Sequence, residues 1–554
     1  MNTTIALPGA LLSIVILAAI LTIPISFVLL SRYRKSLIKG MGYVSRQFKT
    51  PAPEILPVQD NPRERGPEFK LIAAGSLVDD SSPVFFKLKE TLGYHWFVYG
   101  FMCLAASLVS SYCYLEAMDA LSMWRLAYMC LTYFIPFLPI SFLLMANGWK
   151  QILILSALLG FFIVGISYII WAEAGSTLSY WETLKPIVYQ SSIPMAIFFL
   201  LRLWWIRPVS LFLYSFFIFC CSGPLLFLFY VSSHPDVMEQ LAYFFIDAGM
   251  GAHGVLALWV LIPLVISIPV GWLFLKVIRR WYLRKFINDL QLNADAVMIL
   301  FTICYALIIS FSGTGYALLS LLAFPAYKLT GYLLFYFLRR RKIRSNSPKL
   351  LLLRVFALAG DSRNFFARIL KHWRYAGSVQ LISGPDLAID TIEPHELMAF
   401  VAGELKASFC EDAPSIEKKI QHCDQAMDLD STHRVNEFFC RDNNWKFVLK
   451  QLLTVSDVVL MDLRRFSRNH AGCRFEIEAL VQHVDLDQVV FVVDERTDLE
   501  FTREVFHQAF AGVDAANQNI QAGRVVRLYQ IRNQRDGDVF RILNQLCLRL
   551  KSHK

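Results

Sequence analysis

The sequence has few charged residues and no arrangement of cysteines that would indicate a disulfide framework. Charged residues make up 18% of the 554 positions, against roughly 25% in a soluble domain, while 56% are hydrophobic and the mean hydropathy is +0.45. The eleven cysteines include no Cys-x-x-Cys pair and follow no regular spacing, so neither disulfides nor a zinc site is predicted. The shortage of charge excludes a chain that is soluble throughout and indicates a membrane region.

The sequence also lacks the short motifs of several common chemistries. It contains no G-x-x-x-x-G-K-[ST], G-x-G-x-x-G, H-E-x-x-H or G-x-S-x-G, and its histidines are scattered. No metal site and no resident cofactor is therefore predicted. The net charge of +10 is explained by basic loops beside membrane spans, so nucleic acid is not an expected partner.

Long apolar runs fill the chain up to residue 338, and a bilayer-spanning helix needs about 20 such residues. The first run has no basic stretch before it and no A-x-A-like site, so it is predicted to be an anchor and not a cleaved signal. An integral membrane protein in contact with the lipid bilayer is therefore expected. Nine spans are predicted: 6–30, 94–116, 123–145, 151–171, 186–201, 209–231, 252–275, 294–312 and 316–338.

Basic residues are concentrated in every second predicted loop. The loop 31–93 carries eleven Lys and Arg residues, whereas the loops 117–122, 172–185 and 232–251 together carry only Lys185. By the positive-inside rule, this alternation places the N-terminus outside and the C-terminal tail in the cytoplasm, at an inner (plasma) membrane. Basic groups recur in the other cytoplasmic loops: Lys150, Arg202–Arg207, Lys276–Lys285 and Arg339–Arg344.

The predicted organisation has a membrane half and a cytoplasmic half. The Pro-rich loop after the first span is expected to lie along the cytoplasmic face of the membrane. The parts are 1–30 (first transmembrane helix), 31–93 (cytoplasmic Pro-rich basic loop), 94–338 (membrane domain of about eight spans), 339–349 (basic linker) and 350–554 (cytoplasmic α/β domain).

Short apolar runs alternate with amphipathic stretches after residue 350. "LLLRVFALAG" predicts a strand and "RNFFARILKHWRYAG" a helix that ends at Gly377, and "DVVLMDL" followed by "GCRFEIEALVQHV" repeats the pattern. This alternation predicts a doubly wound, mostly parallel sheet of about five strands with helices on both faces, of the flavodoxin-like type.

Charged residues gather at the predicted strand ends, where open parallel sheets bind ligands. Asp361, Asp386 and Asp462 follow three strands and are expected along one edge of the sheet. Arg363 and Arg464 are suited to bidentate binding of phosphate or carboxylate groups. The alternative for Asp462 and Arg464 is that they pair with each other on the rim of the sheet.

Glu476 lies near the start of the helix that follows the third of these strand ends. A carboxylate facing the crevice could stabilise a cationic, sugar-like transition state or attack an anomeric carbon, as in glycosidic cleavage. The alternative is that the helix dipole and capping favour an acid there without any chemistry. Glu478, two positions further on, lies on another face of the helix.

The stretch "SDVVLMDLRRFSRNHAGCRFEIEAL" (456–480) resembles the core of TIR-like domains, in which a strand and a loop lead into a W-C-x-x-E helix. Cys473 and Glu476 match C-x-x-E, while Gly472 stands in place of the Trp and His470 in place of a serine. The resemblance implies that Glu476 is the catalytic residue of an NAD-cleaving enzyme.

The stretch 351–377 is similar to the first strand and helix of the same fold. It also resembles nucleoside 2-deoxyribosyltransferases, whose pattern is a strand, then an acid, then D-x-G-x-x-x-E-x-G. Both relatives use a helix-borne Glu against an N-glycosidic bond. The resemblance therefore implies NAD or a related nucleotide as substrate.

Three functions follow as hypotheses. The first is a bacterial-type inner-membrane sensor or effector, forming a homo-oligomer, whose cytoplasmic TIR-like domain hydrolyses or binds NAD or a related nucleotide. The second is a non-catalytic membrane signalling or scaffold protein, and the third is a transporter with a regulatory cytosolic domain. Intramembrane charges such as Asp295 and Lys328 are expected near span ends, where they can snorkel. The sequence also lacks the repeat of broken helices that many transporters have.

Overall fold

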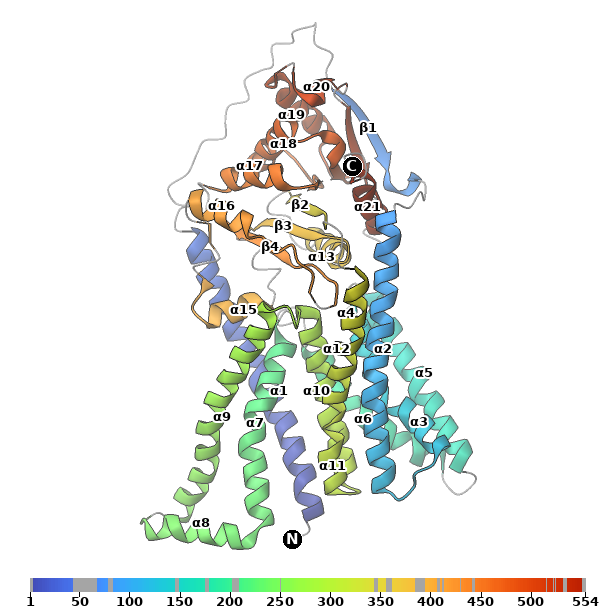
Figure 1. The fold of residues 1–554 in the computed structure, drawn as a ribbon, viewed down its shortest axis with the longest axis vertical. Coiled ribbons are helices and arrows are strands. Elements are labelled where there is room, and N and C mark those ends of the chain that lie inside the picture. Colours follow the sequence, from blue (N-terminus) through green and yellow to red (C-terminus); the bar gives the residue numbers. More distant parts are fainter. Residues whose placement is uncertain are drawn as a thin grey trace. The chain divides into compact units, whose positions relative to one another are not determined.

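The computed structural model divides into two compact units, a helical unit and an α/β unit (Figure 1). The helical unit comprises Met1–Arg32, His95–Arg341 and Glu393–Met398, and the α/β unit comprises Tyr33–Tyr94, Lys342–Ile392 and Ala399–Lys554. The structure describes residues 3–42, 67–77, 83–144, 149–174, 179–201, 209–249, 251–342, 347–354, 361–383, 394–405, 409–410, 413–428, 430–440, 444–514, 516–521, 523, 525–531 and 536–550.

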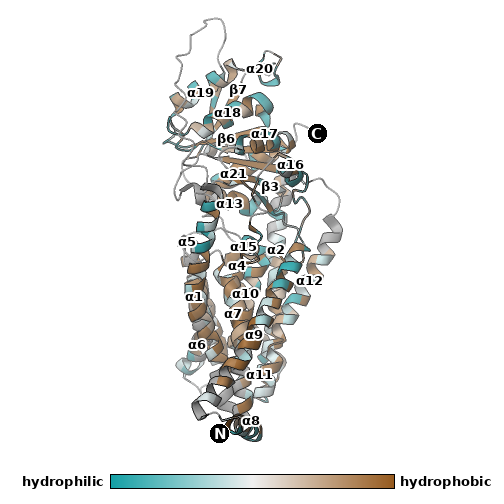
Figure 2. Ribbon diagram, turned by 90° about the vertical axis from the view of Figure 1, so that its left-hand side faces the viewer, coloured by the Kyte–Doolittle hydropathy of each residue, from teal (hydrophilic) through white to brown (hydrophobic). Residues whose placement is uncertain are grey.

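Each of the nine predicted apolar runs falls mainly on helix within the described residues. Their residues are largely hydrophobic, as Figure 2 shows for α7, α9 and α10. The helices are α1 (Thr3–Gly42), α2 (Pro83–Ala117), α3 (Met123–Tyr133), α4 (Phe137–Leu144), α5 (Trp149–Ala174), α6 (Tyr180–Leu201), α7 (Ser210–Ser233), α8 (Pro235–Asp247), α9 (Ala252–Leu283), α10 (Asp289–Ser310), α11 (Thr314–Ser320) and α12 (Ala323–Lys342).

Within the described residues, five helices are long and apolar enough to cross a membrane. The number is six if α3 and α4, which are bent by 42° at their junction, together form one span. The apolar stretches Ser156–Ala172 and Ser210–Pro224 are shorter, so the predicted count of nine spans is not confirmed. The prediction that this half of the chain carries several helices suited to a membrane is therefore confirmed.

The α/β unit is built on one parallel sheet of seven strands, in the order β1-β7-β6-β5-β2-β3-β4. The prediction of about five strands is wrong in number, whereas the parallel, doubly wound character is confirmed. The strands are β1 (Glu68–Ala73), β2 (Lys349–Arg354), β3 (Ser378–Ser383), β4 (Val435–Phe439), β5 (Val458–Asp462), β6 (Val489–Val493) and β7 (Val525–Gln530).

Helices cover both faces of the sheet, because alternate residues of each strand point to opposite sides. On β5, Val459 and Met461 pack with the helices α17, α18 and α19, whereas Val458 and Leu460 pack with α13 and α21. Strands buried on both faces are nearly continuous apolar runs, as parallel strands are. The helices and short turns are α13 (Asp361–Trp373), α15 (Pro394–Val401), α16 (Ala413–Gln421), α17 (Trp445–Val455), α18 (Ala471–His483), α19 (Leu499–Ala511), α20 (Gln518–Gln521), α21 (Asp536–Arg549), η1 (Ala74–Ser76) and η4 (Leu486–Gln488).

The edge strand β1 comes from the segment that the sequence assigns to the Pro-rich loop. Residues 68 to 73 pair in parallel with 525 to 530 of β7. Phe69 packs against the core on one face of the sheet and Ile72 against the core on the other. The α/β fold is therefore completed by residues that precede α2, and a fragment that begins at residue 345 would lack one strand of its sheet.

Candidate functional site

The strand order reverses inside the sheet, as it does beside the ligand-binding crevice of open parallel sheets. From β2 the chain passes outward through β3 to β4, and then returns to the other side of β2 and passes outward through β5, β6 and β7. Counted from β2, this is the 3-2-1-4-5-6 order of the Rossmann fold, with β1 added at the far edge, and it differs from the 2-1-3-4-5 order of flavodoxin-like folds. In such sheets ligands bind outside the carboxyl ends of the strands where the order reverses, which here are β2 and β5.

The last residues of β2 and β5 are register partners, Arg354 and Asp462. Asp361 begins α13, the helix that follows β2, so its backbone lies beside this crevice. The side chains of Asp361 and Arg363 lie outside the part of the chain whose side chains are described, as does the whole of Asp386. Of the six residues predicted for the site, the structure therefore describes the side chains of three: Asp462, Arg464 and Glu476.

Asp462 and Arg464 lie against each other, which is the alternative that the sequence left open. The Arg464 guanidinium donates from Nε to Oδ1 of Asp462 at 2.8 Å and from Nη2 to Oδ2 at 2.7 Å. The pair is buried and not on a rim, with Asp462 0% and Arg464 4% exposed. The guanidinium also lies over the Phe365 ring of α13, 4.3 Å from its centroid, so the pair fixes the end of β5 against that helix.

The loop after β5 is held by the loop after β6. Arg465 has a positive φ of 57°, which is an unfavourable backbone region for a residue other than glycine. Its N–H donates to Oδ1 of Asp494 at 3.0 Å, and the Thr497 hydroxyl donates to the Leu463 carbonyl at 3.1 Å. Because a strained backbone persists where its surroundings determine it, these contacts give the loop between β5 and α18 a defined path.

Glu476 is buried, with 2% of its surface exposed. The helix α18 begins at Ala471 after the cap residue His470, so Glu476 is in the second turn. The capping interaction uses the third helical residue, here Cys473, so a capping role does not explain Glu476. Cys473 and Ile477, which neighbour Glu476 on the helix, are 1% and 0% exposed and belong to the core. A carboxylate in such surroundings is rare, because desolvation disfavours its charged form.

The sequence missed a further carboxylate near this edge of the sheet. Glu437 lies inside β4 and accepts a hydrogen bond of 2.8 Å from the hydroxyl of Ser383, the last residue of β3. The signal was present, since Glu437 follows Asn436 and precedes two phenylalanines, and a Glu in a strand is unusual. Glu437 lies two strands away from β2, so we place it beside the crevice and not in it.

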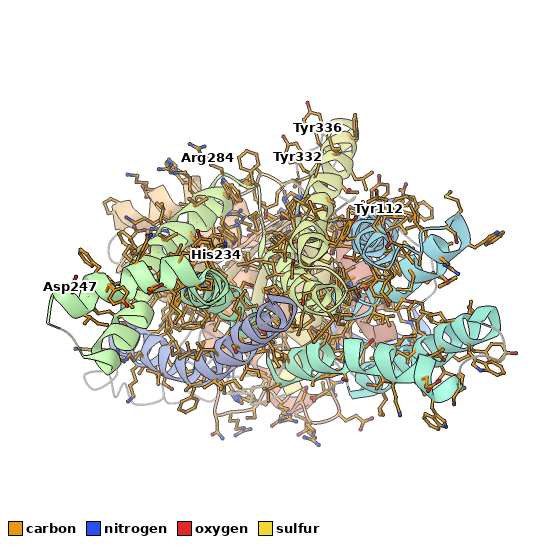
Figure 3. The ribbon with its side chains drawn as sticks, turned by 90° about the horizontal axis from the view of Figure 1, so that it is seen from below. Tyr112, His234, Asp247, Arg284, Tyr332 and Tyr336 are labelled. Atoms are coloured by element: carbon orange, nitrogen blue, oxygen red, sulfur yellow. The ribbon has the colours of Figure 1, made fainter. Side chains whose placement is uncertain are left out.

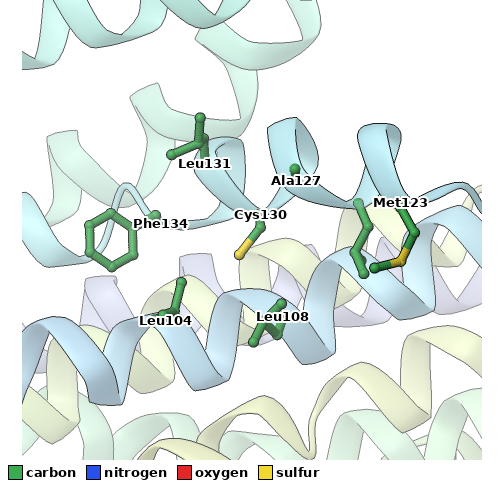
Figure 4. A pocket seen from close by; sticks show the side chains of 8 residues that line it. Leu104, Leu108, Met123, Ala127, Cys130, Leu131 and Phe134 are labelled. Carbon is green, nitrogen blue, oxygen red and sulfur yellow. The ribbon is translucent and has the colours of Figure 1, made fainter.

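A groove of about 400 Å³ lies between α2 and α3 of the helical unit (Figure 4). Its lining is apolar, and in a helix suited to a membrane such a surface fits hydrocarbon and not a polar substrate. The groove therefore gives no support to a transport site. It is lined by Leu104, Leu108, Met123, Leu126, Ala127, Cys130, Leu131 and Phe134.

Comparison with protein-family models, with curated proteins and with solved structures finds no match to this chain. Across the described part of the chain, no group of three or more His, Cys, Asp or Glu residues is arranged to hold a metal ion. The site is thus defined by its own geometry: a parallel α/β sheet whose order reverses between β2 and β5, with a buried carboxylate on the helix that follows β5.

Proposed function

We propose that the chain is a membrane-anchored sensor or effector of bacterial type, whose α/β unit binds NAD or a related nucleotide at the carboxyl ends of β2 and β5. The observation that carries the proposal is the buried carboxylate of Glu476 on the helix that leaves this crevice. The apolar helices anchor the α/β unit to an inner (plasma) membrane, on its cytoplasmic side.

The chemistry that we propose is cleavage of the N-glycosidic bond between ribose and nicotinamide. The C1′–N bond breaks, nicotinamide leaves with the bonding electron pair, and an oxocarbenium-like centre develops on the sugar. The Glu476 carboxylate stabilises that positive charge, and water then forms the new C1′–O bond and releases one proton. The products are nicotinamide and the remaining nucleotide, whose ribose now carries a hydroxyl group at C1′.

Burial of Glu476 sets a condition on this mechanism. With 2% of Glu476 exposed, the sugar reaches the carboxylate only if the residues that cover it move. The resemblance to TIR-like domains supplies a cause, since those domains often complete their site by self-association. We therefore propose a homo-oligomer as the active form.

The alternative is a signalling scaffold in which the α/β unit only self-associates. The observation that favours it is the closed state of the same region, in which Arg464 already binds Asp462 and Glu476 is buried. A scaffold needs no nucleotide, so a measurement of NAD binding distinguishes the effector from the scaffold.

Saturable binding of NAD to the full-length protein in detergent or bilayers is the expected result. Asp361→Asn, at the start of the helix after β2, is expected to weaken binding, because an acid beside such a nucleotide site accepts hydrogen bonds from ribose hydroxyls. The matched control is Asp487→Asn. The Asp487 carboxylate forms an exposed pair with Arg527 just before β6, so this variant is expected to bind NAD as the wild type does. Equilibrium dialysis with labelled NAD measures both. Binding that is absent, or equally weakened by both variants, contradicts the proposed site.

The orientation is tested with reporter tags. A tag at the C-terminus and one in the 43–66 segment are expected to report the cytoplasm, and one after α8 the opposite side, because basic residues are retained on the cytoplasmic side. Accessibility of each tag in intact and permeabilised cells is the measurement. A C-terminal tag outside the cytoplasm would contradict the orientation and, with it, access to cytoplasmic NAD.

A further inference from the structure

The helical unit contains an ion pair between two of its helices, beyond the first turn of each. Lys328 of α12 donates from Nζ to Oδ2 of Asp295 on α10 at 2.7 Å, and the two side chains are 32% and 10% exposed. Asp295 lies six residues, about 9 Å, inside the start of α10. The sequence predicts that this side chain snorkels at a span end, whereas in the structure it pairs with a residue of another helix. Ionisable residues inside membrane helices are costly and mark ion or proton sites.

Several buried polar atoms of the helices that carry this pair lack a hydrogen-bond partner among the described residues. They include Oδ1 of Asp295 and the hydroxyls of Tyr327 and Tyr305, two side chains that are 0% and 1% exposed. Buried polar groups of folded proteins are hydrogen-bonded to protein or to water, because an unsatisfied group costs about 1–3 kcal/mol. Water is the small ligand that satisfies such atoms in a polar interior.

Electrostatic and ring contacts link these atoms to further polar side chains. Tyr327 lies within electrostatic range of Asp295 and of Tyr99 and Cys103 on α2. Tyr305 in turn lies near Cys103 and packs edge-on against Tyr133 of α3, with ring centroids 4.6 Å apart. We define the polar seam as Asp295, Tyr327, Tyr99, Cys103, Tyr305, Tyr133 and Tyr114.

The polar seam extends from the ion pair to one end of α2. The Tyr133 and Tyr114 ring centroids are 6.2 Å apart, and Tyr114 is three residues from the end of α2 at Ala117. Between Tyr99 and Tyr114 the helix rises about 22 Å. Tyr112, which is 49% exposed, shows that side chains of this last part of α2 reach the surface (Figure 3). The seam therefore joins Asp295 to an accessible helix end.

The groups that face Asp295 come from the helices packed around it. Lys328 of α12 is the charged group, and Tyr327 of the same helix lies within electrostatic range of Asp295. Tyr99 of α2 lies within electrostatic range of Tyr327. From α7, Tyr214 faces Cys304, further along α10. Tyr332, one turn after Lys328, projects away from the bundle (Figure 3).

We propose that Asp295 is a proton-binding site that exchanges protons through the polar seam with the helix end near Ala117. A hydronium ion at that end gives its proton to a chain of water molecules and hydroxyls and is left as water. The last member of the chain transfers a proton to Oδ1 of Asp295, which becomes a neutral carboxylic acid. Lys328 keeps its charge and loses its anionic partner, so proton binding weakens the contact between α10 and α12. The inference is independent of the nucleotide site.

Infrared difference spectra of the full-length protein in bilayers, recorded between high and low pH, test the proton-binding site. A carbonyl band of a protonated carboxyl group is expected in the wild type, lost in Asp295→Asn and shifted in frequency in Asp295→Glu. The control is Glu239→Gln, which removes an exposed acid of α8 and is expected to retain the Asp295 band. A wild-type spectrum that equals that of Asp295→Asn would overturn the proton-binding site.

The polar seam is tested by the rate at which this band appears after a pH jump. Tyr305→Phe removes one buried oxygen and no other atom, so the fold is expected to persist while protonation of Asp295 slows several-fold. Tyr332→Phe, the same change on an outward-facing side chain, is the matched control and is expected to leave the rate unchanged. Equal rates in the two variants would show that the hydroxyls are not the route and would overturn the seam.

Discussion

Replacing Arg464 by methionine is expected to destabilise the α/β unit by about 3–5 kcal/mol, the range found when one partner of a buried ion pair is removed. Asp462 is 0% exposed, so its charge would remain in the protein interior without the two guanidinium hydrogen bonds of 2.8 and 2.7 Å. The contact between the guanidinium and the Phe365 ring would also be lost. Thermal unfolding of the full-length protein, followed by near-ultraviolet circular dichroism, measures the change.

The matched control is Arg468→Met, in the same loop. The Arg468 side chain is 68% exposed and approaches Glu504 only to 3.7 Å, so this substitution is expected to change stability by less than about 0.5 kcal/mol. The double variant Asp462→Leu with Arg464→Met removes both charges and is expected to recover much of the loss. If Arg464→Met and Arg468→Met unfold at the same temperature, the buried pair does not hold the end of β5.

Glu476→Gln is expected to lower the rate of nicotinamide release by roughly 100-fold or more while NAD binding is retained. The substitution keeps the shape of the side chain and removes its negative charge, so it removes a contact that strengthens as positive charge develops on the sugar. Single-turnover kinetics with saturating NAD measure the chemical step, and dialysis measures binding.

Glu478→Gln is the matched control for this experiment. Glu478 is half-buried, lies two residues further along α18 and belongs to another face of the helix, so a turnover rate close to that of the wild type is expected. Equal loss in both variants would indicate a general effect on α18 and would contradict a catalytic role for Glu476.

The strands beside the crevice could be predicted because their sequences are dictated by burial on both faces. Residues 458 to 462 are all buried and the first four form one apolar run, and a polar loop marks where the strand ends. The start of α18 at Ala471 was predictable in the same way, from the loop before it. These features depend on local sequence alone.

The parts that could not be predicted depend on contacts between distant segments. The strand β1 has a mixed burial pattern and follows a Pro-rich stretch, so only its pairing with β7 identifies it as a strand. The pairing of Lys328 with Asp295 joins two helices and is decided by their packing. The mutual pairing of Asp462 and Arg464 was one of two readings of the sequence, and the position of Phe365 beneath the guanidinium favours it.

The central claim is that the α/β unit cleaves the glycosidic bond of NAD or a related nucleotide. Its most direct test is to incubate the full-length protein in bilayers with NAD, over a range of protein densities, and to measure free nicotinamide by chromatography. The account predicts release that rises more steeply than the protein density, because self-association opens the site around Glu476. NAD that remains intact at every density, in a protein whose α/β unit is folded, would contradict the account and favour the signalling scaffold.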